Sequence, residues 1–291
     1  MESRFQLFKS SSCESRYMDA YETTLKEWLI PYESTDITTQ HGRTHVITCG
    51  KKTSCPLILL HAGYASSTMW FPNVLELSQN NHIYAIDTIG EPGKSIPVQS
   101  ISSKQEMANW LIGVLDKLDI DEANVAGLSR GGWLSINLAI HAPERVKKMC
   151  LLSPAASFIS LNKFFGLIAS SVMHIRTRTI LKAALYSWVA KGYKINPNFA
   201  EQFIIGLKGW KYPKVGIMPL AFESEELRNL TMPVLMLIGD QDRLNSGISI
   251  ERAKQLIPDI ETDVILNAGH FLSMDQAKIV NEKILKFLGS I

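Results

Sequence analysis

The chain has 291 residues, of which 46% are hydrophobic and 20% are charged, which suits one large globular domain with an insertion or two smaller domains. The formal net charge of +2 gives no reason to expect nucleic acid as a partner. The N-terminal segment MESRFQLFKSSSCESRYMDA lacks the apolar run of about 7–15 residues of a signal peptide, so we expect none. The most apolar stretch, residues 164–173, is too short to span a membrane and predicts a buried or cap helix.

The first predicted element is an amphipathic helix over residues 14–30. Its apolar positions recur at helical spacing, at Tyr17, Tyr21, Leu25 and Trp28. Two strands follow, over residues 34–39 and 44–49, and the segment QHGR between them predicts a hairpin.

From residue 56 onward, short apolar runs rich in β-branched residues alternate with helical patterns, as in strands buried on both faces of a parallel sheet. The runs are PLILLH, HIYAIDT, ANVAGLS, VKKMCLLS, PVLMLIGD and TDVILNAG. Ser103 and Glu106 have the spacing of a capping box at a helix start, and the chain ends in a helix over about residues 274–288. The alternation breaks once, over residues 155–230, where helical patterns continue without a strand. The sequence therefore predicts one doubly wound sheet with a helical insertion.

The four cysteines are Cys13, Cys49, Cys55 and Cys150. None belongs to a C-x-x-C pair or to a cysteine and histidine cluster with the spacing of zinc ligands. We therefore expect reduced thiols, a cytoplasmic location and no metal site. Nothing in the sequence indicates an organic cofactor.

The segment GLSRGG, residues 127–132, carries the strongest chemical signal. Ser129 follows the apolar run NVAGL and precedes the helical pattern WLSINLAIHA, which is the strand, turn and helix context of a nucleophile elbow. Such a sharp turn needs small residues, here Gly127 and Gly131. The alternative is an ordinary Gly-rich turn whose serine only caps the following helix.

A nucleophilic serine needs a base that is oriented by an acid. His270 follows the last apolar run and is preceded by Ala-Gly, so we expect it to be the base. Asp240 and Asp242 both follow the preceding run, and we favour Asp242 as the acid because it lies further into the loop. Asp240, next to the strand end, is expected to bond backbone amides of the turn.

An oxyanion hole completes acyl-transfer chemistry, because negative charge develops on the former carbonyl oxygen. We expect one donor to be the backbone N–H of Arg130, directly after the nucleophile. The other is expected from the loop HAGYASS, where Gly63 is the better candidate and Tyr64 the next.

Taken together, these residues resemble the α/β-hydrolase superfamily from about residue 32 to the C-terminus. The blocks that carry the resemblance are LLHAGYASSTMW, AIDTIGEPGKS, GLSRGG with HAPERV, and GDQDR with NAGH. The stretches SSTMWFPN, TIGEPGKS and AGHFLSMDQ look most like bacterial carboxylesterase-type members with a helical cap. The resemblance implies a mostly parallel eight-stranded sheet flanked by helices, with a helical cap after the sixth strand. It divides the chain into an N-terminal extension (1–31), a core (32–154 and 231–291) and a cap (155–230).

The chain departs from the family pattern at two places. Ala62 stands after His61, where the family usually has glycine, and its methyl group is expected to narrow the approach to the oxyanion hole. Arg130 places a charge beside the nucleophile, where it either binds substrate or points away into a salt bridge; we favour the salt bridge. Since relatives with an aspartate nucleophile are excluded by Ser129, esterases, lipases, thioesterases, C–C bond hydrolases and perhydrolases remain.

The predicted insertion is strongly basic. Residues 155–220 contain nine lysines and arginines and one acid, Glu201, interleaved with aromatic residues. We expect the aromatic side chains to cover the pocket while the basic ones face water; the alternative is a field that attracts anionic substrates. The leading functional hypothesis is a serine hydrolase that cleaves a small-molecule carboxylic ester through an acyl-enzyme. The alternatives are a thioesterase, a C–C bond hydrolase, or a ligand-binding receptor or sensor on the same fold.

Overall fold

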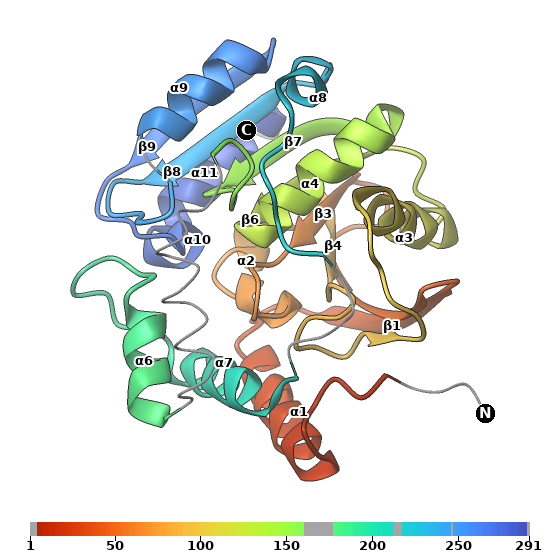
Figure 1. Ribbon diagram of the computed structural model, residues 1–291, viewed down its shortest axis with the longest axis vertical. Coiled ribbons are helices and arrows are strands. Elements are labelled where there is room, and N and C mark those ends of the chain that lie inside the picture. Colours follow the sequence, from red (N-terminus) through yellow and green to blue (C-terminus); the bar gives the residue numbers. More distant parts are fainter. Residues whose placement is uncertain (1–4, 160–176, 212–216, 246, 290–291) are drawn as a thin grey trace.

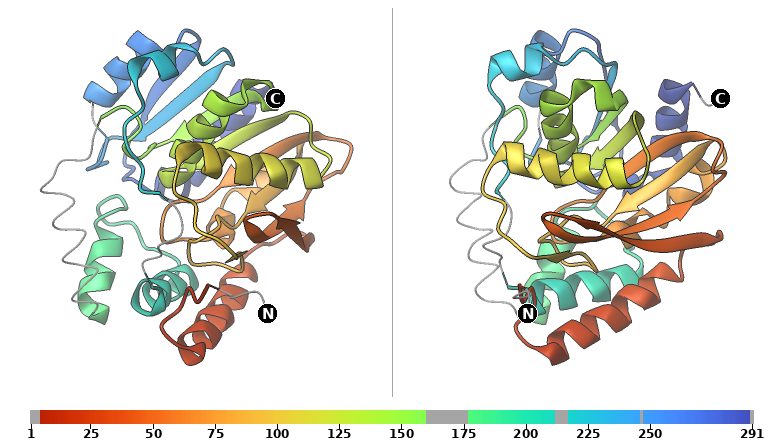
Figure 2. Two further views of the ribbon diagram at one scale, coloured as in Figure 1. Left: turned by 45° about the vertical axis from the view of Figure 1, so that its right-hand side comes forward. Right: turned by 90° about the vertical axis from the view of Figure 1, so that its right-hand side faces the viewer.

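The computed structural model describes residues 5–159, 177–211, 217–245 and 247–289, and it shows one twisted sheet with helices on both faces (Figures 1 and 2). The strands are β1 (Tyr32–Thr39), β2 (Gly42–Cys49), β3 (Cys55–Leu60), β4 (Asn81–Ile86), β5 (Ile96–Pro97), β6 (Ala123–Leu128), β7 (Val146–Leu152), β8 (Val234–Gly239) and β9 (Ile260–Ile265). Their order is β1-β2-β4-β3-β6-β7-β8-β9, with β5 paired to β2. Strand β2 pairs antiparallel with β1 and β4, and β3, β4, β6, β7, β8 and β9 run parallel. The α/β-hydrolase fold is confirmed.

In the part of the chain that the structure describes, β5 adds a ninth strand to the predicted eight. It pairs Pro97 with Gly42 and Ile96 with Arg43. Two residues that include a proline cannot produce an alternating pattern, so the sequence gives no signal for this strand.

Alternate residues of the central strands pack on opposite faces of the sheet. Leu57 and Leu59 belong to one hydrophobic cluster, and Ile58 and Leu60 belong to the other. The second cluster includes residues of α3 (Lys104–Lys117), α4 (Arg130–His141), α8 (Ser224–Arg228) and α9 (Gly247–Leu256). The first includes residues of α2 (Val74–Leu77), α10 (Leu272–Asp275) and α11 (Ala277–Leu288). Because both faces are covered, the central strands β3, β6 and β8 are apolar and buried, as their sequence runs predicted. The last run, TDVILNAG, departs from this prediction: it forms the edge strand β9, where Val264 is 44% exposed.

The N-terminal helix α1 (Ser11–Leu25) begins earlier and ends earlier than predicted. Its start is fixed by Ser10, whose side chain accepts a hydrogen bond from the Cys13 N–H at 3.2 Å. The helix ends at Leu25, and Pro31 disfavours helical backbone at residue 30, the end expected from the sequence. Trp28 is nonetheless buried in the first hydrophobic cluster, and its indole N–H donates to the Thr68 carbonyl at 3.2 Å.

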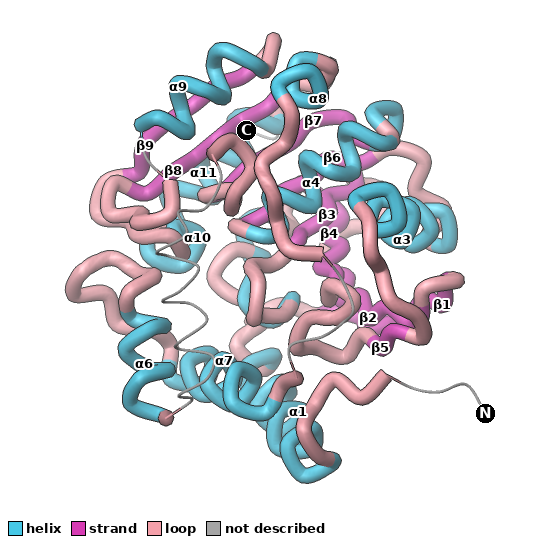
Figure 3. The backbone as a smooth tube through the Cα atoms, viewed as in Figure 1, coloured by secondary structure: helices cyan, strands magenta, loops and turns pink. Residues whose placement is uncertain are grey.

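The chain between β7 and β8 includes α6 (Arg178–Tyr186) and α7 (Pro197–Gly209), which lie beyond one end of the sheet (Figures 1 and 3). Helix α7 lies between α1 and α6 and contacts both. A buried network joins these elements: Gln202 of α7 donates to the Tyr17 hydroxyl of α1 at 3.2 Å and to Ser66 at 2.9 Å. Helix α8, which the sequence grouped with the cap, instead lies next to α9. The predicted helix over residues 164–173 lies outside the described residues. No helix in the described part of the chain is long and apolar enough to cross a membrane.

Candidate active site

Ser129 stands on a sharp turn between β6 and α4. Its backbone lies at φ 56° and ψ −112°, a conformation that costs a non-glycine residue on the order of 1–3 kcal/mol. A Cβ on Gly127 would lie 2.2 Å from the Gly131 carbonyl oxygen, and one on Gly131 would lie 1.9 Å from that of Leu60. The Ser129 side chain makes no capping hydrogen bond to α4, so the simple helix cap considered above is wrong.

The structure brings His270 and Asp242 to this serine. The Nε2 atom of His270 lies 2.8 Å from the Ser129 Oγ, and its Nδ1 lies 3.1 Å from each carboxylate oxygen of Asp242. Asp242 also accepts hydrogen bonds from the Leu244 N–H at 2.8 Å and the Asn245 side chain at 3.0 Å. Burial alone would raise the pKa of Asp242, but the neighbouring His270 and these hydrogen bonds outweigh it and lower the pKa to about 2. The acid is therefore ionised at neutral pH.

Asp240 lies at the exposed end of the same strand, β8. Its carboxylate accepts a hydrogen bond from the Ala268 N–H at 3.0 Å. Asp240 thus binds a backbone amide, as expected, but one in the loop that carries His270 and not in its own turn. The bonds to the histidine are made by Asp242.

A cap segment, residues 188–191, holds the loop of His270. The Phe271 N–H donates to the Trp188 carbonyl at 3.0 Å, and the Trp188 ring lies edge-on to the His270 ring with centroids 4.8 Å apart. Asp275 accepts from the Ala190 N–H at 2.9 Å and from the Gly269 N–H at 2.6 Å. Burial raises the pKa of Asp275 to about 6.

The close approach of this segment requires glycine at position 269. A Cβ there would lie 2.6 Å from the Val189 carbonyl carbon. Sequence reasoning missed the roles of Trp188 and Asp275, although Asp275, five residues after His270 in AGHFLSMDQ, was an acid close enough to the base to be noticed.

His61 fixes the loop that follows β3. The Thr88 N–H donates to its Nε2 at 2.9 Å, so the ring proton is on Nδ1, which donates to the Ala62 carbonyl at 2.8 Å. Burial lowers the pKa of His61, which keeps the ring neutral. The Ala65 N–H also donates to the Ala62 carbonyl, at 3.2 Å. Because the carbonyl and N–H of one trans peptide point in opposite directions, this pinned carbonyl directs the Gly63 N–H to the other side of the loop.

The other two candidate donor residues differ in their bonding. The Tyr64 N–H donates to the Glu91 carboxylate at 2.8 Å and is therefore occupied. The Arg130 N–H lies in the first turn of α4, where backbone N–H groups have no helical acceptor. The N–H groups of Gly63 and Arg130 thus remain better candidates for oxyanion donors than that of Tyr64.

The Arg130 side chain is in a salt bridge, as favoured from the sequence. Its Nε lies 2.9 Å from the Glu91 carboxylate, and its Nη1 donates to the Ile217 carbonyl at 2.8 Å. Glu91, an acid among the small residues of DTIGEPGKS, is a site residue that sequence reasoning missed.

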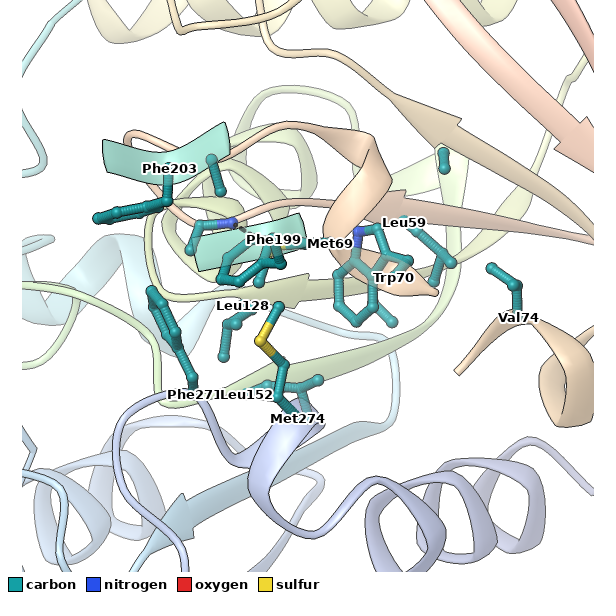
Figure 4. Packing of buried hydrophobic residues seen from close by; sticks show 14 of the residues in the cluster. Leu59, Met69, Trp70, Val74, Leu128, Leu152, Phe199, Phe203, Phe271 and Met274 are labelled. Carbon is teal, nitrogen blue, oxygen red and sulfur yellow. Dashed lines mark hydrogen bonds between the residues drawn. The ribbon is translucent and has the colours of Figure 1, made fainter. Parts of the chain in front are cut away.

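Aromatic and aliphatic side chains gather between the cap and the sheet (Figure 4). Phe199 and Phe203 of α7 face Phe271, at centroid distances of 6.4 and 6.2 Å, beside Leu128 and Leu152 at the ends of β6 and β7. The basic cap residues that the structure describes are all exposed: Arg178, Lys182, Lys191, Lys194, Lys208 and Lys211. Lys163, Arg176 and Lys214 lie outside the described residues. In the described ranges, the cap is apolar toward the sheet and basic toward water.

The described residues contain no group of three or more His, Cys, Asp or Glu side chains placed to hold a metal ion. All four cysteines are free.

A mostly parallel sheet with a cap after its sixth long strand, and a serine, histidine and aspartate at its carboxyl edge, defines an α/β hydrolase. A profile of the alpha/beta hydrolase family matches residues 57–283, and the chain belongs to this family. It is 36% identical over 288 residues to the uncharacterized carboxylesterase nap of Bacillus subtilis (strain 168), covering 94% of this chain and 93% of that one. It is 34% identical over 281 residues to carboxylesterase YbfK of the same organism, with the same coverage.

Solved structures give the same result. The crystal structure of naproxen esterase (carboxylesterase NP) from Bacillus subtilis matches with a TM-score of 0.89 and 36% identity, covering 96% of this chain and 99% of that one. Carboxylesterase CesB (YbfK) from Bacillus subtilis matches with a TM-score of 0.90 and 32% identity, covering 96% and 100%. The predicted resemblance to bacterial carboxylesterases is confirmed.

Proposed function

We propose that this protein is a carboxylesterase that cleaves small-molecule esters through an acyl-enzyme on Ser129. The observation that carries the proposal is the continuous hydrogen-bonded arrangement of Ser129, His270 and Asp242, with 2.8 Å between Oγ and Nε2. Its kinship with the Bacillus carboxylesterases supports ester hydrolysis as the reaction.

In the first step, His270 Nε2 takes the hydroxyl proton as the Ser129 Oγ attacks the ester carbonyl. The tetrahedral intermediate collapses to the acyl-enzyme when His270 returns that proton to the departing alcohol oxygen. A water, deprotonated by the same nitrogen, then attacks the acyl carbonyl and releases the acid. Asp242, ionised at neutral pH, holds the proton on Nδ1 and stabilises the imidazolium in both steps.

The negative charge of each intermediate needs hydrogen-bond donors in place beforehand. We assign these donors to the N–H groups of Gly63 and Arg130. The first is supported by the pinned Ala62 carbonyl, and the second by its position at the N-terminus of α4, where the helix dipole also favours an anion.

The test is steady-state hydrolysis of p-nitrophenyl esters of increasing acyl length by the wild type and by Ser129→Ala. We expect turnover by the wild type and a loss of about 10⁶ in kcat for the variant. A variant that retains a tenth of the activity would overturn the assignment. Saturable binding without turnover would favour a ligand-binding receptor or sensor. Faster cleavage of thioesters would favour a thioesterase, and faster cleavage of C–C bonds would favour a C–C bond hydrolase.

For the location of the enzyme we propose the cytoplasm. The support is that its four cysteines form no disulfide. Fractionation of the source cells tests this: activity recovered only outside the cytoplasmic fraction would contradict it.

A further inference from the structure

A buried ion pair lies behind the proposed oxyanion loop. Glu91 comes from the turn after β4 and Arg130 from the first turn of α4, and their side chains are 8% and 10% exposed. The Arg130 Nε lies 2.9 Å from Glu91 Oε1. Burying two charges is costly, and removing one partner leaves the other uncompensated in a medium that screens poorly.

The second oxygen of Glu91 determines how the loop is turned. Glu91 Oε2 accepts the Tyr64 N–H at 2.8 Å, and Tyr64 is held at φ +65°, a region that is unfavourable for a bulky residue. The Glu91 turn is itself closed by a hydrogen bond from the Glu91 N–H to the Thr88 carbonyl at 3.1 Å. Glu91 therefore fixes the Gly63–Tyr64 peptide plane, while His61 fixes the preceding Ala62–Gly63 plane, which carries the Gly63 N–H.

Arg130 contacts the loop directly. A Cβ built on Gly63 would lie 3.6 Å from the Arg130 Cδ, so the arginine stem packs against the glycine backbone. Its Nη1–H bond to the Ile217 carbonyl keeps the guanidinium extended over Glu91. The Glu91 carboxylate thus binds the N–H of the residue that follows Gly63, a proposed oxyanion donor. Without Arg130, its negative charge would repel the negative charge of the intermediate.

We infer that the Glu91 and Arg130 side chains are positioning residues for the esterase reaction: Glu91 sets the loop so that the Gly63 N–H faces the Ser129 side, and Arg130 neutralises Glu91. This inference rests on the proposed function. Both side chains are buried and bonded to protein groups, so their effect is expected on the transition state, in kcat rather than in KM.

The experiment compares Glu91→Gln, Arg130→Met and the double variant with the wild type. Glu91→Gln keeps an amide oxygen for the Tyr64 N–H, and we expect kcat to fall less than about tenfold. Arg130→Met leaves a lone buried carboxylate, and we expect kcat to fall on the order of 10²-fold, as for loss of one oxyanion donor. The double variant, with no charge left, is expected to recover at least about tenfold in kcat over Arg130→Met.

The matched control is Arg43→Met, which breaks the exposed Arg43–Asp36 ion pair of the β1–β2 hairpin and is expected to leave kcat and KM unchanged. Thermal unfolding of every variant identifies any that does not fold. Hydrogen exchange of the Tyr64 amide gives a readout that does not depend on activity: protection is expected in the wild type and in Glu91→Gln, and its loss in Glu91→Met.

Three results would overturn the inference: Arg130→Met with kcat within twofold of wild type, a loss confined to KM, or a double variant no faster than Arg130→Met. An unprotected Tyr64 amide in the wild type would also overturn it. If the wild type itself hydrolyses no ester, the proposed function fails, and the exchange result still decides whether Glu91 holds the loop.

Discussion

Replacing Asp242 with asparagine changes one atom and is expected to remove the general base. The carboxylate of Asp242 accepts from His270, from the Leu244 N–H and from the Asn245 side chain. An amide has only one oxygen, so the two loop donors occupy it and the NH₂ group turns to the His270 Nδ1. The ring proton then moves to Nε2, which donates to the Ser129 Oγ instead of accepting its proton. We expect kcat to fall by roughly 10⁴, equivalent to about 5.5 kcal/mol of transition-state stabilisation.

The assay is steady-state ester hydrolysis, with Asp240→Asn as the matched control. Asp240 is exposed, and an asparagine oxygen can still accept the Ala268 N–H, so we expect kcat to stay within about twofold. If Asp240→Asn lost more activity than Asp242→Asn, the reasoning would be refuted and Asp240 would be the orienting acid.

Three further predictions concern stability and specificity. Asp275 has a pKa near 6 when folded against an ordinary 3.8, so folding favours its neutral form and its ionisation destabilises the protein as pH rises from about 4 to 6. The melting temperature of Asp275→Asn is therefore expected to rise relative to that of the wild type between pH 4 and pH 7. A difference in melting temperature that stays the same across this pH range would contradict the prediction. Gly131→Ala places a Cβ 1.9 Å from the Leu60 oxygen and is expected to lower the free energy of unfolding by about 3 kcal/mol. Gly113→Ala, in α3, places a Cβ at an ordinary 3.7 Å from the Thr39 side chain and is expected to raise this free energy by up to about 1 kcal/mol. Denaturant titration of both variants checks the two values. Because the described basic cap side chains face water, a neutral ester is expected to react at least as fast as its carboxylate-bearing counterpart, with equal salt dependence of kcat/KM; a carboxylate advantage that shrinks with salt would contradict this.

Much of the fold and of the candidate site could be predicted from the sequence, because local patterns determine them. Strands buried on both faces must be continuously apolar, and the runs from PLILLH to PVLMLIGD match β3, β4, β6, β7 and β8. The run TDVILNAG locates β9 correctly, but this strand lies at the exposed edge of the sheet. The three reacting groups of the candidate site stand at strand ends, where chain order alone brings them to one edge of the sheet.

The partners of buried charges could not be predicted in the same way. Glu91 and Arg130 are 39 positions apart in the chain, and their contact depends on how β4 and α4 are placed in three dimensions. The same holds for Trp188, which reaches His270 only because the cap segment folds back over Gly269. The Glu91–Arg130 and Trp188–His270 contacts each join segments that are far apart in the chain, so the local sequence of either segment does not indicate them.

Covalent labelling tests the central claim most directly. The wild type is treated with a fluorophosphonate probe, digested and analysed by mass spectrometry, with Ser129→Ala as the comparison. We predict one adduct per chain, on the peptide that contains Ser129, at a rate that falls strongly in His270→Ala because the base is missing. An adduct on another residue, or equal labelling of Ser129→Ala, would contradict the assignment of Ser129 as the nucleophile.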